Sequence, residues 1–220
     1  MEVGSDNLFH KRKARSAREL ARRAARKSDY ESILIVCEGT KTEPNYFKEL
    51  IDELELNTAN VQTVSSPSTC PRQLVEFAVE LAKSDEYDSV YCVFDKDNHK
   101  KFNEAMQLIS VSKKLVSAHS VPCFEYWLIL HFDASATPFY GNANKSPGAE
   151  ALAKLKKYVP KYEKGDAGTF SLVMKRMDKA VENAVKVNAS ALAAGTDNPS
   201  TYVVDLIQVL TGIREKMDAS

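Results

Sequence analysis

The sequence lacks any apolar run long enough to cross a membrane. Its 220 residues are 44% hydrophobic, yet no run approaches the roughly 18 apolar residues that a transmembrane helix needs. The N-terminal residues are charged, whereas a secretory signal peptide would need an apolar segment there. These two absences predict a cytoplasmic protein with no membrane partner.

Cysteine is scarce and carries no recognisable pattern. The four cysteines lie far apart and form no Cys-x-x-Cys pair, and three of them fall inside apolar segments: Cys37, Cys70, Cys92 and Cys123. Such spacing predicts buried free thiols and indicates neither disulfides nor a zinc site. The chain also has no Gly-x-x-x-x-Gly-Lys-Ser/Thr motif, so any ATPase that works with it would be a separate chain.

Two short apolar runs that end in acidic residues are the most informative feature present. Residues 33–37 precede Glu38, and residues 90–94 precede Asp95 and Asp97. Both runs are β-branched or aromatic and too short for a buried helix, so they predict buried parallel strands. Ligands bind at the carboxyl ends of such strands. If the two strands are neighbours, the three carboxylates converge there, and an all-oxygen set suits Mg²⁺ or Mn²⁺.

The remaining pattern predicts an α/β fold with a four-stranded parallel sheet flanked by helices. Beyond the two acid-bearing runs, further strands are expected near 61–64 and 115–120, and helices over 71–83 and 100–114. The alternation of strands and helices predicts right-handed crossovers and a parallel sheet. Placing the two acid-bearing strands side by side gives the order 2-1-3-4, which has its switch point between them.

The residues after the first run predict the start of a helix close to the same site. Thr40 with Glu43 fits a capping box, while Thr42 as N-cap would place Pro44 in the first turn. Gly39 would let the backbone approach a phosphate, or it simply makes a tight turn. Lys41 could bind the same phosphate, or it is a solvated lysine.

A very apolar helix is expected over 123–132, with Trp127 in the core. Glu125 near its start either favours the helix dipole or is a fourth acid of the site. His99, after the second acid-bearing run, is a proton carrier near the metal or ordinary polar surface.

The C-terminal part is expected to be helical. Residues 133–147 are loop-like, and helices are predicted over 149–158, 169–194 and 201–216, with Ser200 as N-cap of the last. The chain is thereby divided into a basic arm at 1–30, an α/β domain at 31–135 and a helical region at 136–220.

A net charge of zero conceals an uneven distribution. Residues 1–27 carry nine basic and three acidic residues, so the rest of the chain carries −6. The basic residues are Lys11, Arg12, Lys13, Arg15, Arg18, Arg22, Arg23, Arg26 and Lys27. This arm is either a solvated segment or an electrostatic grip on nucleic-acid phosphates. Lysines at 154, 156, 157, 161 and 164 form a second basic patch with the same two interpretations.

Four blocks in this order resemble the Toprim domain and, more specifically, the RloB-type family found beside bacterial restriction and anti-phage loci. The blocks are residues 36–47, 94–99, 120–132 and 198–201. The resemblance implies a Toprim-like fold and a Mg²⁺-dependent nuclease acting on DNA or RNA, with Glu38, Asp95 and Asp97 in the site. It also implies an anti-phage setting with a separate ABC-type ATPase.

Two alternatives stay open. In the first, the chain is a non-catalytic phosphate- or nucleotide-binding module. In the second, it is an interaction subunit of a defence complex. The sequence also leaves the oligomeric state open, with a homo-oligomer among the alternatives.

Overall fold

The computed structural model describes residues 30–56, 60–96 and 101–219. The predicted basic arm, apart from Tyr30, therefore lies outside the described residues, as do Asp97 and His99. Within these ranges, no helix combines the length and the apolar character that spanning a membrane requires.

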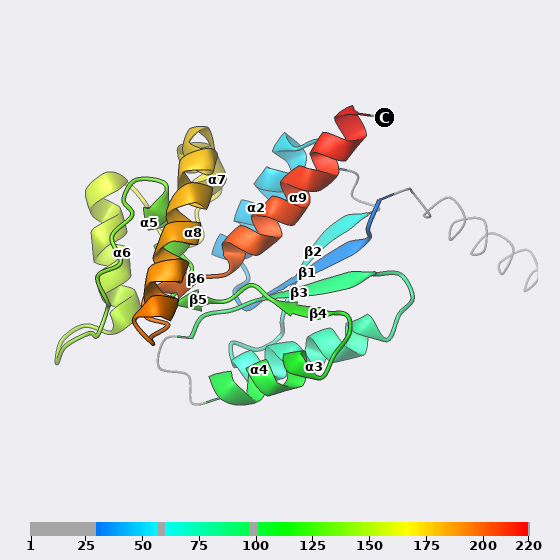
Figure 1. Ribbon diagram of the computed structural model, residues 1–220, viewed down its shortest axis with the longest axis horizontal. Helices are drawn as coiled ribbons and strands as arrows, with labels where there is room; N and C mark the ends of the chain where they lie inside the picture. The colour runs from blue at the N-terminus through cyan, green and yellow to red at the C-terminus, as the bar shows by residue number, and fades with distance from the viewer. Residues whose placement is uncertain (1–29, 57–59, 97–100, 220) are drawn as a thin grey trace, which may run out of the picture.

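Four parallel strands form the central sheet, in the order β2-β1-β3-β4 (Figure 1). Their bounds are Ile33–Cys37 for β1, Val61–Ser65 for β2, Ser89–Val93 for β3 and Leu115–Ser117 for β4. The predicted α/β class and strand order are confirmed, and the two acid-bearing strands are direct neighbours, with Cys37 opposite Val93.

Helices cover both faces of the sheet. Every residue of β1 is apolar and buried, as is typical of a strand whose side chains meet helices on both sides. Ile33 and Ile35 face a core that includes α2 (Thr42–Glu53) and α9 (Val203–Asp218). Leu34 and Val36 face a second core formed with α3 (Pro71–Ala82) and α4 (Phe102–Ser110). Figure 1 shows the two helix pairs on opposite sides of the sheet.

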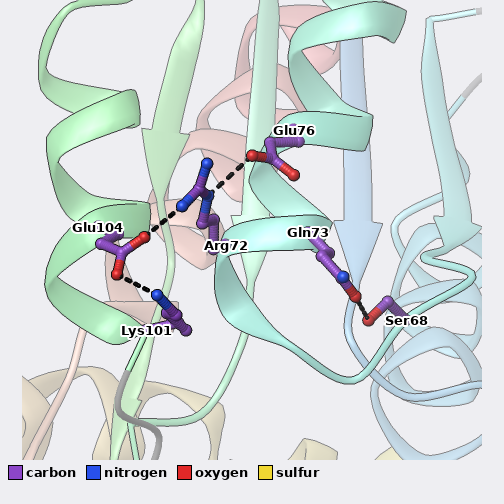
Figure 2. Close-up of polar contacts among 6 residues, drawn as sticks. All are labelled: Ser68, Arg72, Gln73, Glu76, Lys101 and Glu104. Atoms are coloured by element: carbon purple, nitrogen blue, oxygen red, sulfur yellow. Dashed lines mark hydrogen bonds and ion pairs between the residues drawn. The ribbon is translucent and has the colours of Figure 1, made fainter.

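Helices α3 and α4 are joined on their outer side by an ion-pair network. Arg72 of α3 reaches Glu76 of its own helix and Glu104 of α4, and Lys101 pairs with the same Glu104 (Figure 2). These side chains are 39–51% exposed, so solvent screens the network and it contributes little to the stability of the fold. The apolar contacts beneath it hold the two helices together.

The expected fourth strand is divided in two, which corrects the prediction for 115–120. After β4 the chain forms β5 (Ser120–Val121), which pairs antiparallel with β6 (Ser200–Thr201). Ser200 is therefore a strand residue and not the N-cap of α9, whose N-cap is Tyr202. The hydroxyls of Ser120 and Thr201 lie 2.8 Å apart and are buried, so each satisfies the other.

The C-terminal helices lie beyond the carboxyl ends of the strands (Figure 1). They are α5 (Glu125–Leu130), α6 (Pro147–Tyr158), α7 (Thr169–Val173), the 3₁₀ turn η1 (Met174–Arg176) and α8 (Met177–Ala193). The single helix predicted over 169–194 is wrong, because the break lets α7 pack on α2 while α8 packs on α5. Glu49 of α2 accepts hydrogen bonds from the amides of Gly168 and Ser171 and so caps α7.

Candidate acidic site at the strand ends

Glu38 and Asp95 are held together by the ends of β1 and β3. The amide of Glu38 donates to the carbonyl of Val93 at 2.9 Å. The amide of Asp95 donates to Glu38 Oε2 at 3.0 Å. Because β1 and β3 are adjacent and in register, each strand delivers its first acid to the same edge of the sheet.

Asp95 also connects this edge to α5. Its Oδ1 accepts a hydrogen bond of 2.9 Å from the amide of Phe124, the residue just before the helix. Glu125 follows as the first helical residue, and it is only 2% exposed. The apolar helix is shorter than the predicted 123–132, but it does bring a third carboxylate to the strand ends.

Glu43 is the acid that the sequence pattern misassigned. The N-cap of α2 is Lys41 and makes no side-chain cap hydrogen bond, so the predicted capping by Thr40 or Thr42 is wrong. The Glu43 carboxylate lies over Gly39, where an added Cβ would overlap it. Gly39 thus makes room for the Glu43 side chain. The glycine after Glu38, with Glu43 four residues later, is the sequence signal that could have located Glu43 in the site.

The pKa values of two of these acids show how closely the charges gather. Burial raises the pKa of Asp95 well above its usual value, and Glu43, Glu125 and Glu38 raise it further. Burial likewise raises the pKa of Glu43 to about 7, with further contributions from Glu125 and Glu38. The carboxylates of Glu38, Glu43, Asp95 and Glu125, hereafter the acidic site, therefore interact as one cluster of like charges.

Two residues from the segment after α6 complete the surroundings of Glu125. The Tyr162 hydroxyl donates to Glu125 Oε1 at 3.2 Å, and Lys164 Nζ lies 3.0 Å from the same oxygen. Partial burial opposes the charged form of Lys164, but Glu125 raises the pKa of this lysine to about 12. Sequence reasoning placed Lys164 in a general basic patch and singled out neither residue, since nothing local in the sequence marks them.

The other carboxylate oxygen of Glu125 is free to bind a ligand. Glu125 Oε2 is buried and has no hydrogen-bond partner among the described residues. Oxygen-only donors, mutual repulsion and an unpartnered buried oxygen fit a hard divalent cation. The fit is one of charge and donor type: in the described ranges, no three Asp, Glu, His or Cys side chains form a group that could hold a metal ion.

The remaining predicted site residues lie elsewhere in the fold or outside the described ranges. Lys41 is exposed, and its aliphatic stem packs against Gly165, whose φ of +87° and close neighbour both require glycine. Asp97, His99 and the basic residues of the arm lie outside the described residues. The four cysteines are free, and three of them are buried, as predicted.

A family model described as RloB-like protein matches residues 33–210. The chain belongs to the RloB-like protein family. The match begins at the first residue of β1 and ends within α9, so this family unit includes the sheet, the acidic site and the C-terminal helices. No curated protein and no solved structure matches the chain.

Proposed function

We propose that this RloB-like protein is a nuclease that hydrolyses phosphodiester bonds of DNA or RNA with Mg²⁺ or Mn²⁺, using a Toprim-like arrangement of acids. The observation that carries the proposal is the acidic site itself. Four carboxylates gather at the ends of β1 and β3 and on α2 and α5. The other acids raise the pKa values of Asp95 and Glu43, and one buried oxygen of Glu125 has no partner in the described residues. Such a site is stabilised by a bound cation.

Asp95 and Glu125 are the residues proposed to hold the metal, together with Asp97 from the sequence pattern. Asp95 is already oriented by the amide of Phe124. A bound Mg²⁺ or Mn²⁺ would neutralise charge on the phosphate and favour ionisation of water. Glu38 has the role of ligand or of proton-transfer group toward the attacking water or the leaving oxygen.

The partners in this proposal are nucleic acid and a separate ABC-type ATPase. The basic residues of the arm supply the counter-charge that a phosphate backbone needs beside an acidic site. The setting is anti-phage defence in the cytoplasm, as the resemblance to restriction-linked proteins implies.

A non-catalytic phosphate-binding or interaction subunit is the second candidate. It is favoured by one observation: within the described parts of the chain, no three Asp, Glu, His or Cys side chains form a group able to hold a metal. A phosphate-binding module would show metal-dependent stabilisation without turnover, whereas an interaction subunit with relic acids would show neither.

Cleavage assays on a substrate panel test the proposal. Purified protein is incubated with plasmid, single-stranded DNA and total tRNA, with Mg²⁺, Mn²⁺ or a chelator, and with and without its genomic ATPase partner. We expect metal-dependent cleavage of at least one substrate and its loss in Asp95→Asn, which keeps an acceptor for the Phe124 amide. If the wild type cleaves nothing under any of these conditions, the non-catalytic alternative takes its place.

A further inference from the structure

Lys164 places a positive charge directly beside one carboxylate of the acidic site. Its ammonium lies 3.0 Å from Glu125 Oε1, and Glu125 is 2% exposed, whereas the lysine side chain is 52% exposed. The lysine therefore reaches from the surface to a buried carboxylate. Its positive charge also partly offsets the raised pKa values of Asp95 and Glu43, so it acts on the cluster beyond Glu125.

The segment that carries Lys164 is fixed to the helix that carries Glu43. Asn45 of α2 donates through Nδ2 to the carbonyl of Gly165 at 3.3 Å. Glu49 of the same helix accepts from the amide of Gly168, and the stem of Lys41 packs on Gly165. These contacts hold the backbone beside Lys164 against α2, so the fold places the lysine within reach of Glu125.

We propose that Lys164 is a positioning residue that serves as the internal counter-cation of the acidic site, and that a divalent cation binds by displacing its ammonium from Glu125. Two cations compete for one buried carboxylate, so the ion pair orients Glu125 before metal arrives and lowers the apparent affinity for metal. This inference rests on the proposed metal-dependent function and assigns a residue that the sequence pattern did not single out.

The test is the affinity for Mn²⁺, measured by calorimetry and by the metal-induced rise in melting temperature. We expect Lys164→Met to bind Mn²⁺ about tenfold more tightly than the wild type, the size expected when a unit charge several ångströms from a divalent ion is removed. Lys164→Arg keeps the charge and should remain near the wild type. Lys164→Gln, which can still donate a hydrogen bond to Glu125, serves if Lys164→Met does not fold.

Two controls separate displacement from a general change of charge. Lys161→Met removes an exposed lysine of the same segment that lines an apolar hollow with Phe132 and Leu172, and it should leave the Mn²⁺ affinity unchanged. In a Glu125→Gln background, Lys164→Met should give no further gain. A gain that persists without the Glu125 charge, or one that Lys161→Met reproduces, would overturn the inference.

The outcomes for the two proposals are distinct. Equal Mn²⁺ affinity of wild type and Lys164→Met, with metal-dependent cleavage intact, overturns the role of Lys164 and leaves the nuclease standing. Binding of Mn²⁺ by Lys164→Met but not by the wild type supports displacement. Absence of Mn²⁺ binding in both proteins overturns the inference and removes the metal-dependent function with it.

Discussion

The amide of Asp95 donates a hydrogen bond of 3.0 Å to the carboxylate of Glu38, a residue 57 positions away in the chain. Each acid therefore has its position set by the pairing of β1 with β3, and not by its own loop. Substitutions that keep the acceptor oxygen at Glu38 should preserve this geometry while changing the chemistry of the side chain.

Glu38→Gln keeps an oxygen that can accept from the Asp95 amide, so the fold, nucleic-acid binding and most of the metal-induced stabilisation should remain. Cleavage should fall by at least about two orders of magnitude, since general acid–base help is typically worth 10²–10⁴-fold. Single-turnover cleavage rates and nucleic-acid Kd values measure the two effects separately. Cleavage near the wild-type rate would remove Glu38 from the chemistry.

Mn²⁺ should raise the melting temperature of the wild-type protein, because a ligand that binds only the folded state stabilises it. Asp95→Asn combined with Asp97→Asn should abolish this rise, and the metal-free variant should be as stable as the wild type or more so, since repulsion is relieved. Asp52→Asn, at an exposed position of α2, is the matched control and should retain the full shift. Equal shifts in all three proteins would contradict the metal assignment.

The metal-free protein should lose stability as the pH rises. The pKa of Glu43 is about 7 in the folded state against 4.5 ordinarily, so its protonated form is favoured by folding. Its contribution is fully present below pH 4.5 and is lost as the pH rises through about 7, and it amounts to at most about 3 kcal/mol.

Denaturant unfolding between pH 4 and pH 8 in the presence of a chelator measures this slope. Glu43→Gln should flatten it, whereas Glu53→Gln, at an exposed position of the same helix, should not. A wild-type slope that Glu43→Gln leaves unchanged would show that Glu43 titrates normally.

Deleting residues 9–27 should weaken nucleic-acid binding and reduce its salt dependence. On duplex DNA the log–log slope should fall by about 0.9 for each phosphate that the arm neutralises in the wild type. The deleted residues precede the family match at 33–210, so the fold and the Mn²⁺ affinity should stay the same. Filter binding across a salt series gives the slope. An unchanged slope would assign the arm to a solvated or partner-binding role.

Trp127 Nε1 donates to the Tyr46 hydroxyl at 2.8 Å, and both side chains are fully buried. Trp127→Phe should destabilise the protein by about 1–3 kcal/mol through the buried hydroxyl that loses its partner, with a further cost for the cavity. In the double variant with Tyr46→Phe the cost should be less than the sum of the single costs. Strictly additive unfolding free energies would show that the hydrogen bond does not couple the two residues.

The strands and their acids could be predicted from the sequence because the relevant information is local. A five-residue run that is apolar at every position, as in β1, is a buried parallel strand, and an acid directly after it must lie at the edge of the sheet. Placing β1 beside β3 is an assumption that lets their acids converge, and the structure confirms it. Glu38 and Asp95 follow from these two steps, and Glu125 follows from the helix after the next strand.

What surrounds those acids was decided only by the tertiary structure. A glutamate in the first turn of a helix suits a cap as well as a site, and only the packing of α2 on the sheet turned Glu43 over Gly39. Tyr162 reaches Glu125 across 37 residues of sequence, and Lys164 comes from the same segment. Their approach depends on how that segment binds α2, and such long-range packing leaves no periodic pattern in the sequence. The local pattern thus determined which acids the strands deliver, whereas the fold determined which other charges they meet.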